Sequence, residues 1–299
     1  MSGTPPTIDA LQAAFAERRY VADRDLATSI HLSLALGRPL LLEGEAGVGK
    51  TDVGRTLALV LGAELIRLQC YEGLDVNTAV YEWDYPRQML EIRLLEARGE
   101  AKSAATRDIF SEEFLIRRPL LKALSNSHLE PPVLLIDEID RADEEFEAYL
   151  LEVLADFAVT VPEIGTIKAE RPPRVIITSN RTREVHDALK RRCLYHWIDY
   201  PSPERELSIL HHRMPDLPEA LAREVVTFVQ RLRSADLTKV PGIAETIDWA
   251  AALVALGAKQ LDAERIERTL GALLKYQEDV SAMRGGGARK LLDEVRAGA

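Results

Sequence analysis

The stretch LLLEGEAGVGKT, from Leu40 to Thr51, carries the signals that decide the fold. Its three leucines form the short apolar run expected of a buried strand. Gly44, Gly47 and Gly49 follow, and glycines let backbone amides turn inward around an anion without Cβ clashes. A helical pattern opens at Lys50, and the amides and dipole at a helix N-terminus favour negative charge. The stretch predicts a phosphate-binding loop; a glycine-rich turn without a ligand is the alternative.

If the loop binds phosphates, its positions have expected tasks. Lys50 is expected to contact the β- and γ-phosphates, and the Thr51 hydroxyl is expected to bind Mg²⁺. The expected cofactors are therefore a nucleotide, such as ATP or ADP, together with Mg²⁺. The residues expected to line the nucleotide are Gly44, Glu45, Ala46, Gly47, Val48, Gly49, Lys50, Thr51 and Asp52.

Composition narrows the class of protein. The chain has 299 residues, of which 46% are hydrophobic and 29% charged, so a sizeable core and two domains are expected. A net charge of −10 argues against nucleic-acid binding by bulk electrostatics. The two cysteines, Cys70 and Cys193, indicate neither a disulfide framework nor a zinc site. With no signal peptide and no apolar run of the roughly 18 residues that a membrane span needs, a cytoplasmic location is expected.

A second motif, VLLIDEID, places acids at the end of an apolar strand. Ligands bind at the carboxyl ends of strands in open α/β sheets. Asp137 is expected to hold Mg²⁺ through its water shell, and Glu138 to orient and polarise the attacking water as a general base. The alternative is an acidic strand end that leads into a capped helix, and Asp140 and Asp143 are open to that simpler interpretation.

Two further segments supply candidate catalytic residues. Asn180 ends the apolar segment VIITSN, expected to be the strand next to that of Asp137, where its amide would position the water; a plain turn residue is the alternative. Arg191 and Arg192 in ALKRRC are candidates for an arginine finger that reaches a neighbouring subunit's nucleotide. A solvated basic helix end explains these arginines equally well, and the pattern does not choose between them.

The chain changes character near Pro201. Residues 1–201 read as a parallel α/β nucleotide domain with a long insert at about 72–125, and residues 202–299 read as helices only. A helix is expected from about Glu17 to Gly37, and the first strand is expected to start at Pro39. The fold class is thus a P-loop parallel sheet flanked by helices, followed by an all-α lid domain.

The order of GEAGVGKT, LLIDEID, IITSN and ALKRRC, followed by a helical domain, resembles an AAA+ ATPase. The segment QCYEGLDVNTAVYEWDYPRQML and the insert after it resemble the MoxR family, and within it the CoxD-like branch, over about Tyr20 to Leu256. The resemblance implies a ring, usually a hexamer, with ATP at subunit interfaces. It also implies a von Willebrand factor A partner and chaperone-like maturation of a client metalloenzyme, namely molybdenum hydroxylases such as carbon monoxide dehydrogenase.

This sequence departs from the family at one position. MoxR relatives usually carry an arginine near the start of a lid helix, whereas the matching segment, KVPGIAETIDWAAAL, has Glu245 and no arginine. Either Lys239 substitutes, or the lid does not contact the γ-phosphate directly. Three other functions stay open: a P-loop kinase or transferase for a small molecule, a nucleic-acid motor, and the ATPase subunit of a metal chelatase.

Aromatic residues concentrate in one segment of the insert. Tyr71, Tyr81, Trp83 and Tyr85 stand close together in a chain that is only 6% aromatic. Aromatic anchors suit a surface for a client or partner. Packing inside an inserted hairpin is an equally good explanation, so the segment alone does not decide between the two.

Overall fold

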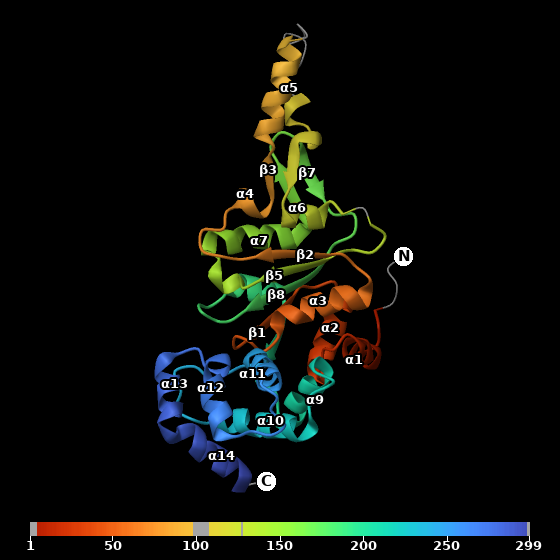
Figure 1. Ribbon diagram of the computed structural model, residues 1–299. Coiled ribbons are helices and arrows are strands. Elements are labelled where there is room, and N and C mark those ends of the chain that lie inside the picture. Colours follow the sequence, from red (N-terminus) through yellow and green to blue (C-terminus); the bar gives the residue numbers. More distant parts are fainter. Residues whose placement is uncertain (1–4, 98–107, 127, 298–299) are drawn as a thin grey trace. The chain divides into compact units, whose positions relative to one another are not determined.

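A central five-stranded sheet organises the computed structural model, which describes residues 5–97, 108–126 and 128–297 (Figure 1). The strand order is β2-β5-β8-β1-β9, and the β2–β5, β5–β8 and β1–β8 pairs are parallel. The three inner strands are apolar runs, as expected for strands covered on both faces. The sheet strands are β1 (Leu40–Gly44), β2 (Leu65–Gln69), β5 (Val133–Asp137), β8 (Arg174–Ser179) and β9 (Leu194–Ile198).

Helices cover both faces of this sheet. On one face Leu41, Ile136 and Ile177 belong to a hydrophobic core that also takes in α6 (Pro119–Leu124) and α7 (Glu144–Asp156). On the other face a Cβ on Gly54 of α3 (Lys50–Leu61) would lie 3.0 Å from the Leu135 side chain, so this helix packs closely on the sheet. The predicted parallel α/β class is confirmed.

The first helices differ from expectation in one respect. Helix α1 (Ile8–Glu17) ends where the predicted helix was to begin, and α2 starts only at Arg24 and runs to Leu36. The predicted helix over residues 18–23 is therefore wrong. The Asp23 carboxylate accepts a hydrogen bond of 2.7 Å from the Leu26 amide, which is how an N-cap residue starts a new helix.

The insert builds its own small structure. Strands β3 (Tyr81–Trp83) and β4 (Leu115–Arg117) pair antiparallel, and α5 (Tyr85–Ala97) extends from β3 away from the central sheet (Figure 1). The aromatic residues of this segment do not all lie in the same environment. Trp83 is buried and packs edge-on against Phe110 and Tyr81, whereas Tyr71 and Tyr85 are exposed. The other elements here are α4 (Val76–Ala79), η1 (Asp108–Phe110) and η2 (Glu112–Phe114).

A helix and a hairpin lie between the acidic motif and β8. The 3₁₀ turn η3 (Ile139–Arg141) leads into α7, and β6 (Ala158–Val161) and β7 (Gly165–Lys168) form an antiparallel hairpin. Helix α8 (Asp187–Arg192) follows β8. The Asp143 carboxylate accepts from the Phe146 amide at 2.8 Å, so this acid is a helix cap, as the simpler interpretation has it.

From Pro201 to residue 297, the regular elements of the chain are all helices. Ser202 caps α9 (Pro203–Arg213), and Leu221, Val225 and Val229 line the buried face of α10 (Glu219–Arg233). The remaining elements are α11 (Ile243–Ala255), α12 (Ala263–Leu273), α13 (Gln277–Ala282), η4 (Met283–Gly287) and α14 (Ala288–Ala297).

The chain divides into two compact units. The first comprises residues 1–6, 28–43 and 54–196; the second comprises residues 7–27, 44–53 and 197–299. The phosphate loop therefore groups with the helical region, and the acidic motif with the sheet, so each is described within its own unit. None of the helices in the described residues combines the length and apolar character that crossing a bilayer requires.

Candidate functional site

The predicted phosphate loop directly follows β1. At its entrance a Cβ on Gly44 would lie 2.2 Å from the Ile198 carbonyl oxygen, so only glycine fits. At its end Lys50 opens α3 and is only 6% exposed. Its Nζ donates to the carbonyl oxygens of Gly44, at 2.8 Å, and Glu45, at 2.5 Å. The ammonium group is therefore held inside the turn, against the backbone that the sequence assigns to phosphates.

Helix α11 contacts the middle of this loop. The Gly47 carbonyl accepts a hydrogen bond of 3.1 Å from the Ala244 amide. Gly47 has a φ of +79°, and a Cβ there would lie 2.7 Å from Oε2 of Glu245. That carboxylate also accepts from the Gly242 amide at 3.0 Å, so the N3 side chain of α11 caps the amide that precedes the helix. A negative charge thus stands beside a loop whose predicted ligand is also negative.

Thr51 and Asp52 lie in the first turn of α3. Both are partly exposed, and Asp52 accepts an ion-pair hydrogen bond of 2.6 Å from Nη2 of Arg213 on α9. Asp52, which the sequence places among the nucleotide-lining residues, therefore ties α3 to α9. The Thr51 hydroxyl stands one residue after Lys50, at the helix start, where the motif predicts a metal ligand.

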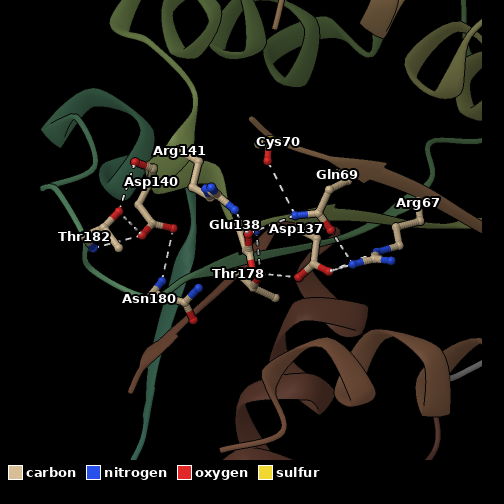
Figure 2. A network of polar contacts seen from close by, with 10 residues as sticks. All are labelled: Arg67, Gln69, Cys70, Asp137, Glu138, Asp140, Arg141, Thr178, Asn180 and Thr182. Carbon is tan, nitrogen blue, oxygen red and sulfur yellow. Dashed lines mark hydrogen bonds and ion pairs between the residues drawn. The ribbon is translucent and has the colours of Figure 1, made fainter. Parts of the chain in front are cut away.

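In the sheet unit, the acidic motif ends β5 as predicted. Asp137 is 1% exposed, and its two carboxylate oxygens have different partners (Figure 2). Oδ1 accepts from the Thr178 hydroxyl at 2.6 Å, whereas Oδ2 accepts from Nε of Arg67 at 2.9 Å and from its Nη2 at 2.5 Å. Both guanidinium nitrogens donate to one oxygen, and each is a charge-assisted hydrogen bond, which is stronger than a bond between neutral groups.

Glu138 differs from its neighbour in exposure and in backbone conformation. Its side chain is 32% exposed, and its backbone adopts φ 58° and ψ 53°, a left-handed conformation that costs a non-glycine residue about 1 kcal/mol or more. Its amide donates to the Thr178 hydroxyl at 2.9 Å, which fixes the turn. Oε2 accepts from Gln69 at 3.1 Å and from Arg141 at 3.2 Å. The carboxylate of Glu138 is thus oriented but reachable by solvent, as a base that activates water has to be.

Asp140 holds the predicted water-positioning segment. One oxygen of its buried carboxylate accepts from the Asn180 amide at 3.1 Å, and the other accepts from the amide and hydroxyl of Thr182 at 2.9 and 2.7 Å. Asn180 immediately follows β8, the strand that pairs with β5, so the expected neighbour relation is confirmed. Asp140 therefore does more than end a strand: it fixes the loop that carries Asn180 (Figure 2).

The two candidate finger arginines end α8 and differ in their contacts. Both are exposed. Nη1 of Arg192 donates to the Leu151 carbonyl at 3.0 Å, which ties this side chain to α7. Arg38 donates to the backbone carbonyls of both residues, at 2.9 Å for Arg191 and 3.2 Å for Arg192. Among the described residues, no hydrogen bond or ion pair holds the Arg191 side chain, so it is the more available of the two.

Three residues around the acids were not anticipated from the sequence: Arg67, Gln69 and Thr178. Arg67 and Gln69 alternate with the buried Ile66 and Leu68 on β2, and that alternation of polar and apolar residues was the available signal. Their partners lie about seventy positions away, so only strand pairing could reveal the contacts.

Glu43, just before the loop, is a further unanticipated residue. It is 3% exposed, and its Oε1 has no hydrogen-bond partner among the described residues. Burial of the Tyr195 phenol is the main cause that raises its pKa. The negative charge of Glu43 and a hydrogen bond with the Glu43 side chain raise this pKa further. The segment LLLEGE gives no signal that Glu43 is buried while Glu45 is exposed. Glu43 lies within the sheet, opposite Ser179 of β8, and this strand pairing cannot be read from the segment itself.

The donors present suit a nucleotide with Mg²⁺. Thr51 offers a hydroxyl and Asp137 a carboxylate, the hard oxygen ligands that Mg²⁺ prefers. Within the described residues, no group of three or more His, Cys, Asp or Glu side chains could hold a metal ion. A divalent ion bound by either residue would therefore depend on few protein ligands and on phosphate oxygens, which is how Mg²⁺ binds in nucleotide sites. The loop glycines and Lys50 stand at the start of α3, where a helix N-terminus favours an anion such as phosphate.

Comparison with known proteins gives a family match and several relatives. A family model described as "AAA domain (dynein-related subfamily)" matches residues 39–193, just over half of the chain. An uncharacterized protein of Staphylococcus epidermidis is 26% identical over 258 residues, covering 83% of this chain and 89% of that protein. An uncharacterized protein of Staphylococcus saprophyticus is 24% identical over 261 residues, covering 84% and 89%.

Among solved structures, matches to this chain include RuvB of Thermotoga maritima, described as a Holliday junction branch migration motor. That structure has a TM-score of 0.46 and 14% sequence identity, and the match covers 91% of this chain and 73% of RuvB. A point mutant of the same RuvB has a TM-score of 0.49 and 16% sequence identity, and the match covers 90% of this chain and 73% of the mutant. Likeness at this level does not extend to activity or partners. The family match spans both the loop after β1 and the acids after β5. The chain belongs to the AAA family, in its dynein-related subfamily, and it is an ATPase.

Proposed function

We propose that this chain is a Mg²⁺-dependent ATPase of the MoxR family, in its CoxD-like branch, and that it hydrolyses ATP to ADP and phosphate at the interfaces of a ring. The observation that carries the chemistry is the contrast between two adjacent carboxylates at the end of β5. Asp137 is buried and charge-paired, which suits a metal ligand, whereas Glu138 is solvent-accessible and oriented, which suits a base.

Each residue has a proposed task in this reaction. The loop amides from Gly44 to Asp52 and the Lys50 ammonium bind the phosphates. Thr51 and Asp137 hold Mg²⁺, which when bound neutralises charge on the phosphate oxygens. Glu138 accepts a proton from the attacking water, and Asn180 positions that water. An arginine of the neighbouring subunit, Arg191 or Arg192, stabilises charge on the transferred phosphoryl group.

The first test replaces Glu138 with glutamine, which keeps the shape and removes the base. Phosphate release should fall about 100-fold or more, the usual contribution of a general base, while nucleotide binding is retained. Lys50→Ala should lose nucleotide binding itself. Glu144→Gln, on the exposed first turn of α7, is the matched control and should leave both unchanged.

Full turnover by Glu138→Gln would show that the assigned base is wrong. ADP formation that requires an added small molecule, without phosphate release, would instead identify a kinase or transferase. Together these measurements separate hydrolysis from phosphoryl transfer before any client is known.

The cellular role that we propose is maturation of a client metalloenzyme, a molybdenum hydroxylase such as carbon monoxide dehydrogenase, in the cytoplasm with a von Willebrand factor A partner. It rests on the resemblance of the motifs and the insert. The test is to produce the hydroxylase in cells with the wild-type chain or with Glu138→Gln. Equal amounts of hydroxylase but loss of its activity with the variant would support the role. Equal activity would exclude it and favour another client, such as a metal chelatase complex.

A further inference from the structure

The ion pair between Arg67 and Asp137 joins a partly exposed side chain to a buried one. Arg67 has a 40% exposed side chain, whereas Asp137 has a side chain that is 1% exposed. Two nitrogens of the guanidinium, Nε and Nη2, donate to the same oxygen, Oδ2, at 2.9 and 2.5 Å (Figure 2). One end of the pair is therefore fixed within the sheet, and the other end can move into solvent.

The sheet register explains why these side chains meet. Gln69 of β2 stands opposite Asp137 of β5, and Arg67 stands opposite Leu135. Arg67 is thus two residues earlier than the position opposite Asp137, on the same face of the sheet. A diagonal spacing of this kind is within reach of a long side chain. Strand pairing, and not a flexible loop, brings the arginine to the acid.

A buried carboxylate needs a positive partner. Removing an ionised carboxylate from water costs several kcal/mol unless a charge or a set of hydrogen bonds compensates it. Arg67 supplies that charge from within the chain, and guanidinium is suited to the task because it is permanently charged and weakly hydrated. The proposed function assigns the same carboxylate to Mg²⁺, so two cations have a claim on Asp137.

We propose that Arg67 is an internal counter-ion that competes with Mg²⁺ for Asp137. It neutralises the acid when no metal is present, and the two cations compete for the single negative charge of the carboxylate when Mg²⁺ binds, directly or through water. The proposal rests on the proposed function, because it takes Asp137 as a Mg²⁺ ligand. Its consequence is that Arg67 sets the Mg²⁺ concentration at which the metal–nucleotide complex forms on the protein.

The experiment replaces Arg67 with methionine, which keeps the aliphatic length and removes the charge. Binding of a fluorescent ADP analogue is titrated with Mg²⁺, and thermal unfolding is followed in EDTA without nucleotide. The half-saturating Mg²⁺ concentration should fall about three- to tenfold, as expected for loss of a partly exposed competing charge. Nucleotide affinity in EDTA should stay unchanged, and the melting temperature in EDTA should fall because Asp137 has lost the guanidinium that donates to its Oδ2.

Arg87→Met is the matched control, because Arg87 is also a half-exposed arginine in an ion pair, with Glu113 in the insert. It should leave the Mg²⁺ titration unchanged. Arg67→Lys retains a charge but loses the paired donors, so its Mg²⁺ midpoint should fall about two- to threefold while folding is better preserved.

An unchanged or raised Mg²⁺ midpoint in a folded Arg67 variant would overturn the proposal. If Arg67→Met does not fold, the Arg67→Lys titration decides in the same way. Failure of the proposed function looks different: the wild-type chain would then show no Mg²⁺-dependent binding of the ADP analogue at all. The two failures are therefore distinguished by the wild-type titration alone.

Discussion

Burial controls the chemistry of a single side chain most clearly at Cys193, which follows α8. Its thiol is 6% exposed, and burial raises its pKa to about 12, against a smaller opposing effect of the Arg38 guanidinium. Only the thiolate attacks alkylating reagents. The native thiol is therefore protonated at the pH values where a free cysteine begins to react.

We expect Cys193 to resist iodoacetamide in the native protein at pH 8 to 9 and to react rapidly in urea. Peptide mass spectrometry distinguishes it from Cys70, whose pKa burial also raises to about 12. Rapid labelling of native Cys193 at pH 8 would contradict this. Burial of this thiol also makes stability depend on pH. Because the pKa of Cys193 is higher in the folded than in the unfolded chain, its contribution to the free energy of unfolding is complete below about pH 9 and is lost as the pH rises towards 12.

Single residues of the site differ in how far the sequence predicts them. Lys50 and Asp137 are recognisable because their chemistry requires a fixed local spacing. The left-handed backbone of Glu138 is not, because glutamate is not a residue that favours this conformation. The turn depends on Thr178, forty residues later, whose hydroxyl accepts from the Glu138 amide. Such contacts between distant strands have no local signature.

At the scale of elements, apolar runs were the most reliable signal. β1, β5 and β8 lie where their leucine, isoleucine and valine runs predicted them, because inner strands of a parallel sheet must be apolar on both faces. The start of α2 was missed because charged residues before Asp23 fit a helix as well as a loop, and only the cap decides. The contact of α11 with the phosphate loop was not predicted, because it joins segments about two hundred residues apart.

That contact gives a prediction about α11. The carboxylate of Glu245 stands beside Gly47 and should repel phosphate groups in the loop. Glu245→Gln keeps an acceptor for the Gly242 amide and removes the charge. We expect ADP affinity to increase about two- to fivefold, the range for a partly exposed charge interaction. A titration with a fluorescent ADP analogue at fixed Mg²⁺ measures it.

Asp248→Asn is the matched control, since Asp248 is an exposed acid about one turn further along the same helix. It should change ADP affinity much less than Glu245→Gln. If the two substitutions had equal effects, general charge and not position would be the cause. If Glu245→Gln weakened binding, the Glu245 carboxylate would be a support for the loop instead of a repulsive group.

At the scale of the whole molecule, the question is whether one chain contains a complete site. The described residues include the proposed phosphate loop, the proposed metal carboxylate and the proposed base, but the proposed reaction also needs a cation near the transferred phosphoryl group. At the end of α8, Arg192 is tied to the Leu151 carbonyl, whereas no intrachain bond among the described residues holds the Arg191 side chain. If the site is completed in a ring, Arg191 is therefore the better candidate for the residue that acts on the neighbouring subunit.

Turnover per chain should then increase with protein concentration, in step with the assembled fraction measured by light scattering. Arg191→Ala should still assemble yet lose about 10³-fold in turnover, the range for a missing arginine finger. Arg192→Ala should reduce turnover less, because its main loss is the contact with α7. Constant turnover down to clear monomer, with both arginines dispensable, would instead mean that one chain holds the whole site. The function would then have to be sought in transfer of the phosphoryl group to a small molecule, because that reaction does not require a neighbouring subunit.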